Sequence, residues 1–174
     1  MAHTLYKIYY MDAAGNDMLV YLGRTNQPLQ NRLRGHLFNK PMHCKLEIDQ
    51  ISRIEYAEFS TEADMNLYEI YYILTLKPPL NVDDKTRDYP TVKLPDVPFQ
   101  PFQPPLWGKW REQIHAQRGR AEASRRTLKE IREQMGIVRS QYRMGEITEE
   151  QRETKLDELQ KEWDAVIVRY DKWR

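Results

Sequence analysis

Six polar side chains in the first half of the sequence have the right types and spacing to form one site. They are two tyrosines, an arginine and a histidine four residues apart, a glutamate and an asparagine: Tyr6, Tyr21, Arg32, His36, Glu69 and Asn81. Arg32 and His36 would lie on one side of a helix, because residues four apart share a helix face. Tyr6 and Tyr21 can share a sheet face if their strands pair.

This combination of groups suits the hydrolysis of a phosphodiester. The reaction needs an activated water, a cation that neutralises the phosphate, and help for the leaving oxygen. A lone carboxylate such as Glu69 suits one hard divalent cation that is also held by waters and by the substrate phosphate. Arg32 can bind phosphate oxygens through two donors. A tyrosine hydroxyl can orient the water, or take its proton if cation and arginine lower the tyrosine pKa.

The elements that would position these groups can be predicted from the same stretch. The segments "TLYKIYYMD" and "MLVYLGRT" are rich in tyrosine and aliphatic residues, which is typical of strands. The Gly-Asn pair between them favours a turn, so we expect an antiparallel hairpin. Leu29, Leu33 and Leu37 then repeat every four residues behind Pro28, which predicts a helix.

A further strand and helix complete this part of the chain. "ISRIEYAEFS" predicts a third strand with Ile54 and Tyr56 facing inward. Thr61 and Asp64 resemble a capping box that opens a helix over "EADMNLYEIYYILTL", which ends before Pro78. The order β-β-α-β-α predicts an α+β fold over residues 1–89, with a small three-stranded sheet, mixed or antiparallel, flanked by helices.

Short motifs surround the six polar residues in a fixed order. They are "TLY" at 4–6, "YLG" at 21–23, "NRLRGH" at 31–36, and Glu69 and Asn81 within "LYEIYYILTLKPPLN". Taken together, these motifs resemble the GIY-YIG nuclease superfamily over about residues 4–82. Thr4 stands where the family has glycine, and leucines stand where it has isoleucine. Every polar position is filled, which favours an active enzyme over an inactive relative.

The resemblance implies a role for each polar residue. Tyr6 would activate or position the water, with Tyr21 assisting, and Arg32 would bind the scissile phosphate. His36 would shuttle a proton or orient a tyrosine. Glu69 would hold Mg²⁺ or Mn²⁺.

Asn81 would position a neighbouring group or backbone segment. The resemblance thus implies a metal-dependent DNA endonuclease, with a phage or mobile-element origin as one compatible setting. Cleavage of RNA in place of DNA stays open. The alternative is a catalytically inactive protein that binds nucleic acid or acts as a coiled-coil adaptor.

Basic residues that could contact the DNA backbone fall into two groups. The first group lies near the candidate site: Arg24, Arg34, Lys40, His43 and Lys45. The second group lies far along the chain in "RGRAEASRR": Arg118, Arg120, Arg125 and Arg126.

Six of the ten prolines fall within residues 90–106. Proline restricts φ and lacks an amide donor, so we expect an extended, semi-rigid linker that lies on a surface through Phe99 and Phe102. The other interpretation of this segment is a ligand for a proline-binding domain.

Residues 107–174 show two heptad patterns separated by "YRMGEITEEQ". Thr148 and Gln151 resemble a capping box, and Gly145 suits the end of the preceding helix. We therefore expect an antiparallel helical hairpin, coiled-coil-like, that binds DNA or forms a homodimer. The arm 107–143 has ten Lys or Arg and four Asp or Glu, whereas 144–174 has six and nine. Charge pairing across the hairpin and a phosphate-binding edge both explain this asymmetry.

The whole chain has 174 residues and a formal net charge of +1, so overall charge does not indicate a nucleic-acid partner. Cys44 is the single cysteine, which excludes an intrachain disulfide and favours a reducing cytoplasm. No apolar run approaches the roughly 20 residues of a membrane span, and the N-terminus lacks the pattern of a signal peptide.

Overall fold

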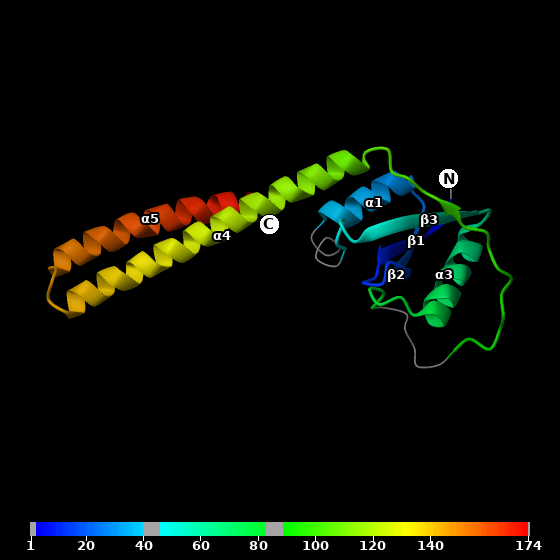
Figure 1. Ribbon diagram of the computed structural model, residues 1–174, viewed down its shortest axis with the longest axis horizontal. Helices are drawn as coiled ribbons and strands as arrows, with labels where there is room; N and C mark the ends of the chain where they lie inside the picture. The colour runs from blue at the N-terminus through cyan, green and yellow to red at the C-terminus, as the bar shows by residue number, and fades with distance from the viewer. Residues whose placement is uncertain (1–2, 40–45, 83–88, 174) are drawn as a thin grey trace. The chain divides into compact units, whose positions relative to one another are not determined.

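The computed structural model describes residues 3–39, 46–82 and 89–173, with side chains as far as Asp171 (Figure 1). The elements are β1 His3–Met11, β2 Asp17–Thr25, α1 Leu29–Phe38, β3 Ile51–Phe59, α3 Glu62–Leu76, β4 Gln100–Pro101, α4 Trp107–Arg143 and α5 Glu149–Trp173. The chain divides into two compact units, residues 1–111 and 112–174.

The first unit is built on one antiparallel sheet with the strand order β2-β1-β3-β4. Tyr6 lies in the central strand and pairs with Gly23 of β2 on one side and with Tyr56 of β3 on the other. The predicted hairpin is present. Asp12 holds its turn by accepting hydrogen bonds from the backbone N–H groups of Ala14 and Asn16, each at 2.8 Å.

The prediction of three strands was wrong, because the proline-rich segment supplies a fourth. β4 pairs with Glu55 and Tyr56, and the N–H of Phe102 donates to the carbonyl of Ile54 at 2.8 Å. Phe102 contacts the Tyr56 ring with centroids 5.8 Å apart. Pro101 lacks an amide donor, yet an edge strand tolerates proline, so two residues suffice to extend the sheet.

α1 and α3 cover opposite faces of the sheet. Leu5 of β1 packs in one cluster with Met65 and Ile73 of α3, and all three are almost fully buried. Tyr6 points to the other face, because successive strand residues alternate, and there it contacts His36 of α1. The predicted capping box opens α3: the Thr61 hydroxyl accepts from the Asp64 N–H at 3.1 Å.

Asn81 holds the outer edge of β2. Its Oδ1 accepts from the Leu22 N–H at 2.9 Å, and its Nδ2 donates to the Leu22 carbonyl at 2.7 Å. The Leu80 N–H donates to the Val20 carbonyl at 2.9 Å. The segment after α3 thereby satisfies backbone groups that an edge strand otherwise leaves to solvent.

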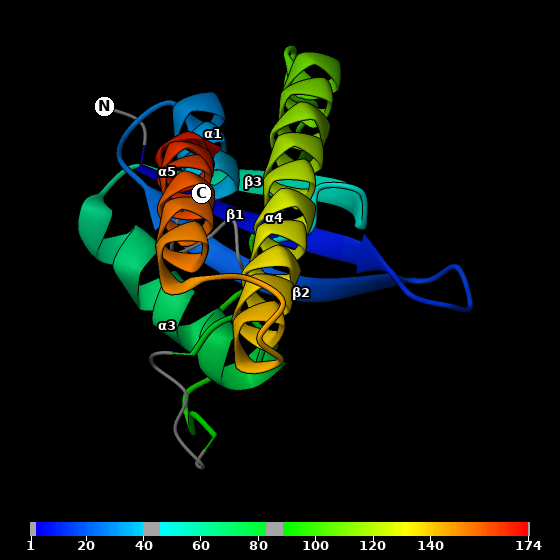
Figure 2. The ribbon, with the colours of Figure 1, turned by 90° about the vertical axis from the view of Figure 1, so that its left-hand side faces the viewer.

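In the second unit α4 and α5 run side by side and are joined by a short turn at Gly145, whose φ is +75° (Figure 2). Arg125 Nε donates to the Tyr170 hydroxyl at 3.0 Å, so the end of α5 lies opposite the middle of α4. The Thr148 and Gln151 capping box is present, with bonds of 3.0 and 3.3 Å. Within the described residues, no helix is long and apolar enough to cross a membrane.

Replacing Asn81 by alanine should destabilise the first unit. The change removes two buried hydrogen bonds and leaves the Leu22 N–H and carbonyl without partners, which costs about 2–3 kcal/mol. Urea unfolding and hydrogen exchange of the Leu22 amide measure this loss. Asn31→Ala, at an exposed position of α1, is the matched control and should change neither. Equal Leu22 protection in Asn81→Ala and in the unaltered protein would contradict this role.

Candidate active site

Two tyrosines and a histidine converge on one face of the sheet. The ring centroids of Tyr6 and Tyr21 are 6.1 Å apart, and that of His36 lies 5.8 Å from Tyr6 and 5.4 Å from Tyr21. The Tyr6 hydroxyl forms a short hydrogen bond with His36 Nε2. Tyr6 is fully buried and His36 is 4% exposed, so this bond is shielded from water. The structure therefore brings together three of the six predicted residues by direct ring contact.

Gly23 makes this convergence possible. A Cβ at position 23 would lie 2.7 Å from the Tyr6 hydroxyl oxygen and 2.7 Å from a ring carbon of Tyr21. No side chain fits in that space, because real Cβ atoms essentially never approach other atoms so closely. The glycine of "YLG" is thus required by the two rings that pass over it.

Arg32 lies one helical turn before His36 and acts on the same groups. Its charge lowers the pKa of His36, as a contribution second to burial, and it partly offsets the effect of burial on both phenols. The buried Nε of Arg32 has no acceptor among the described residues. A buried guanidinium N–H without an acceptor is costly, and a phosphate oxygen is the acceptor that arginine pairs with best.

An open cavity of about 520 Å³ lies beside Arg32. Its lining includes a second arginine, Arg24 of β2, together with Glu62 and Met65 of α3. The Asn26 side-chain N–H donates to Glu62 at 3.0 Å and so ties the loop after β2 to α3. Two guanidinium groups at one cavity give it the character of an anion site.

Glu69 reaches the same region from the opposite face of the sheet. β2 is an edge strand, so groups from α1 and from α3 can meet around its free side. Glu69 is 13% exposed, and its Oε2 lies 2.8 Å from Arg24 Nε. Its charge raises the pKa of Tyr21, as a contribution smaller than burial, which places the carboxylate within electrostatic reach of that phenol.

The donor set fits one hydrated divalent cation. Within the described part of the chain, no three or more His, Cys, Asp or Glu side chains gather into a metal-binding group. A cation at Glu69 would therefore take most of its ligands from water and phosphate, as Mg²⁺ does at single-carboxylate sites. A zinc-type site, which needs several protein ligands, is incompatible with Glu69 alone.

Burial sets the protonation of the three rings. It raises the pKa of Tyr6 well above the usual 10, with a further rise from Tyr21, and it also raises the pKa of Tyr21. Burial, followed by the charge of Arg32, lowers the pKa of His36 to about 4. At neutral pH both phenols are protonated and the imidazole is neutral. The imidazole is then the group that can accept a proton.

The other predicted residues lie elsewhere. Asn81 bonds the backbone of β2 and so positions Tyr21 from a distance. Arg34 is exposed and projects from the side of α1 away from Arg32, because two residues turn a helix by about 200°. The candidate DNA contacts Lys40, His43 and Lys45 lie outside the described residues.

The four predicted DNA contacts on α4 belong to the second unit and are exposed. Arg125 bonds Tyr170, and Arg126 lies 3.7 Å from Glu130, so both take part in contacts within the hairpin. Arg118 and Arg120 stay predicted DNA contacts. Sequence reasoning missed Asn66, which hydrogen-bonds Arg24 and lies three residues before Glu69 on the same helix face; that spacing was the available signal.

The first unit is a small α+β domain in which two tyrosines and a histidine lie in ring contact. Residues 3–81 match the family model of the GIY-YIG catalytic domain, the family that the motifs of this stretch resemble. A nuclease-type function follows in general terms, and nucleases of this family are generally dependent on a divalent metal. Comparison with curated proteins and with solved structures finds no match.

Gly23→Ala should displace the two tyrosine rings and destabilise the first unit by about 1–3 kcal/mol, the usual result of overpacking. Gly35→Ala is the matched control. Its Cβ would meet only the Asn39 side chain at 3.6 Å, and alanine favours the helix. Urea unfolding measures stability, and the nuclear Overhauser effect between the Tyr6 and His36 rings reports their contact. An unchanged Tyr6–His36 contact in Gly23→Ala would show that the rings do not need the glycine.

His36 should stay neutral until the pH falls to about 4. The unfolded chain binds a proton at His36 near pH 6.5, whereas the folded protein does not. Its contribution to stability is therefore complete above pH 6.5 and is lost as the pH falls toward 4, by about 3 kcal/mol. NMR titration of the His36 ring measures the pKa, with His36→Gln identifying its resonance. A titration near 6.5 would contradict the burial argument.

Proposed function

We propose that the protein is an endonuclease that hydrolyses DNA phosphodiester bonds at a GIY-YIG site with a single divalent cation. One observation carries the proposal. The ring centroids of Tyr6, Tyr21 and His36 lie within 6.1 Å of one another, beside the buried Nε of Arg32, which has no acceptor among the described residues. The arrangement offers a proton path and an anion site at the same place.

The proton path begins at the attacking water. A tyrosine hydroxyl with a raised pKa is a poor base alone, so Tyr6 needs a second acceptor. Neutral His36 is that acceptor: with its own proton on Nδ1, Nε2 accepts the hydroxyl proton of Tyr6. As the water oxygen attacks phosphorus, its proton would pass to the hydroxyl of Tyr21, which is only partly buried. The Tyr21 proton then passes to Tyr6, and the Tyr6 proton passes to His36. Tyr21 orients the same water from the neighbouring strand.

Charge on the phosphate is balanced by arginine and by a cation. The Arg32 Nε would donate to a phosphate oxygen and strengthen that bond as negative charge develops in the transition state. Glu69 would hold Mg²⁺ or Mn²⁺, which when bound neutralises the phosphate and stabilises the leaving oxygen. Arg24 lines the same cavity and would provide a further phosphate contact.

The second unit would serve binding. Arg118 and Arg120 lie on α4 before the part that is paired with the end of α5, and their side chains are exposed. A catalytic module joined to a separate helical unit can gain affinity from the second unit without new chemistry. We infer that the hairpin contacts the DNA backbone there. The same plan suits a phage or mobile-element enzyme.

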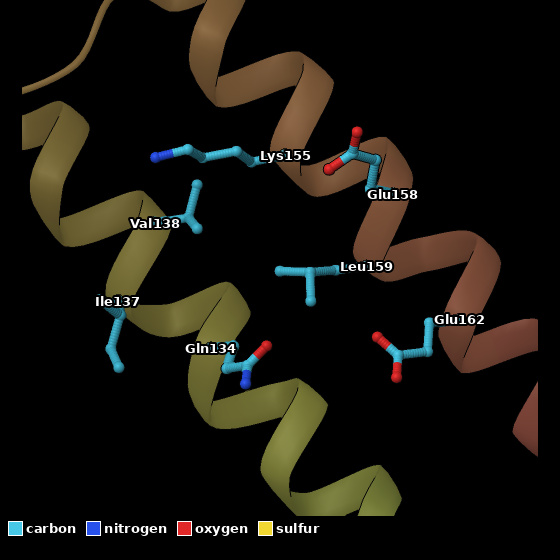
Figure 3. Close-up of a pocket in the computed structure, with 7 residues that line it drawn as sticks. All are labelled: Gln134, Ile137, Val138, Lys155, Glu158, Leu159 and Glu162. Atoms are coloured by element: carbon cyan, nitrogen blue, oxygen red, sulfur yellow. The ribbon is translucent and has the colours of Figure 1, made fainter.

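An adaptor role is the alternative, and a feature of the hairpin favours it. A groove of about 360 Å³ lies between α4 and α5, lined by Ile137, Val138 and Leu159 with charged residues at its rim (Figure 3). Ile137 is 57% exposed. Apolar side chains at such a groove suit a helical partner, including the hairpin of a second copy.

A plasmid-nicking assay with Mg²⁺ or Mn²⁺ separates these functions. Glu69→Gln, Arg32→Ala and Tyr6→Phe should each lower the rate by about 10²- to 10³-fold, because each removes a charge or proton-transfer group. Glu58→Gln, at an exposed position of β3, is the matched control for Glu69 and should nick at the normal rate. Parallel digestion of RNA tests the substrate class. Full activity in Glu69→Gln would discard the site, and an inactive unaltered protein would favour the adaptor.

A further inference from the structure

Arg24 of β2 connects two parts of the candidate site: it lines the same cavity as Arg32 and pairs with Glu69 of α3. It pairs with Leu5 across the hairpin and so projects toward the face that α3 covers. Its Nε lies 2.8 Å from Glu69 Oε2, and its Nη1 donates to Asn66 Oδ1. Asn66 and Glu69 are three residues apart on α3, so one guanidinium is held by two side chains of one helix face.

This contact competes with the role of Glu69 as a metal ligand. Arg24 contacts one of the two oxygens of the carboxylate that would ligate a divalent cation, and the positive guanidinium repels the cation at close range. The proposed chemistry needs the opposite arrangement, with the Glu69 carboxylate on the cation and Arg24 elsewhere. A cation therefore binds Glu69 more strongly once Arg24 has moved away.

The surroundings of Arg24 provide an alternative position for it. The Arg24 side chain is 45% exposed, whereas that of Glu69 is 13% exposed, so the arginine has room to move. Arg24 and Arg32 line the same open cavity of about 520 Å³. A backbone phosphate bound at Arg32 would attract the second guanidinium, because its two anionic oxygens accept charge-assisted hydrogen bonds from arginine.

We propose that Arg24 is a latch that withholds Glu69 from a divalent cation until a nucleic-acid phosphate draws the arginine away. The latch rests on the proposed function, since it assigns Glu69 to the metal. It couples the two ligands: phosphate binding takes the arginine away from the carboxylate, and by linkage a bound cation favours phosphate binding by the same factor. Arg24 thus acts first as a positioning residue for Glu69 and then, once a phosphate is bound, as a phosphate contact.

Binding of Mn²⁺ to the full-length protein without DNA, followed by electron paramagnetic resonance, tests the first half of the latch. Arg24→Met removes the competing charge and should tighten Mn²⁺ binding about tenfold. Asn66→Ala loosens the arginine without removing its charge and should give a gain of about threefold. Adding Glu69→Gln to Arg24→Met should abolish the gain.

Arg53→Met is the matched control. Arg53 also pairs with carboxylates, Asp17 and Glu55 at 3.4 Å each, but it lies on β3 outside the cavity, so Mn²⁺ affinity should not change. A general loss of positive charge would tighten binding equally in both arginine variants, and that result would overturn the latch.

DNA binding tests the second half. A phosphorothioate duplex should raise the Mn²⁺ affinity of the unaltered protein more than that of Arg24→Met, because the variant has no latch to release. The slope of duplex affinity against salt concentration reports the number of phosphate contacts. That number should fall by about one in Arg24→Met and stay unchanged in Asn66→Ala.

The outcomes separate the latch from the proposed function. If the unaltered protein nicks DNA and Arg24→Met binds Mn²⁺ no more tightly, the latch is wrong and the endonuclease stands. If the unaltered protein neither binds Mn²⁺ nor nicks DNA, both are wrong. Tighter Mn²⁺ binding in Arg24→Met that depends on Glu69, with no change in Arg53→Met, supports both.

Discussion

The packing of Tyr6 against Gly23 is the constraint on which the candidate site depends. Tyr6 lies in the central strand, and its ring passes over the one residue of β2 that has no side chain. This brings the hydroxyl to His36 and the ring beside Tyr21. The same burial keeps both phenols protonated and the imidazole neutral, so geometry and proton chemistry have one cause.

The position of β2 at the edge of the sheet explains how one site draws on both faces. Tyr21 points toward α1, and Arg24 points toward Glu69 on α3. In a central strand, neighbouring strands would separate these two groups. An edge strand carries the risk of slipping or pairing elsewhere, and Asn81 counters it by bonding both backbone groups of Leu22. Asn81 thus supports the chemistry without taking part in it.

Much of the fold could be predicted because its signals are local. Alternating tyrosines and aliphatics, the Gly-Asn turn, and the boxes at Thr61 and Thr148 each act over a few residues, and the structure contains the elements that they predict. The fourth strand could not be predicted from local signals. Pro101 argues against a strand, and tertiary contacts bring the segment to the edge of β3: Phe102 docks on Tyr56 and Phe99 docks on Tyr72.

Some properties of the candidate site could likewise be predicted from the sequence, whereas others depend on tertiary contacts. The sequence by itself determined which chemical groups are present, their order, and the match of residues 3–81 to the GIY-YIG catalytic domain, since residue type and spacing are properties of the chain. The tertiary structure alone decided that Gly23 lies under two rings, that Arg24 pairs with Glu69 with the help of Asn66, and that His36 is neutral. These properties depend on burial and on distances between residues far apart in the chain, and neither exists before the chain folds.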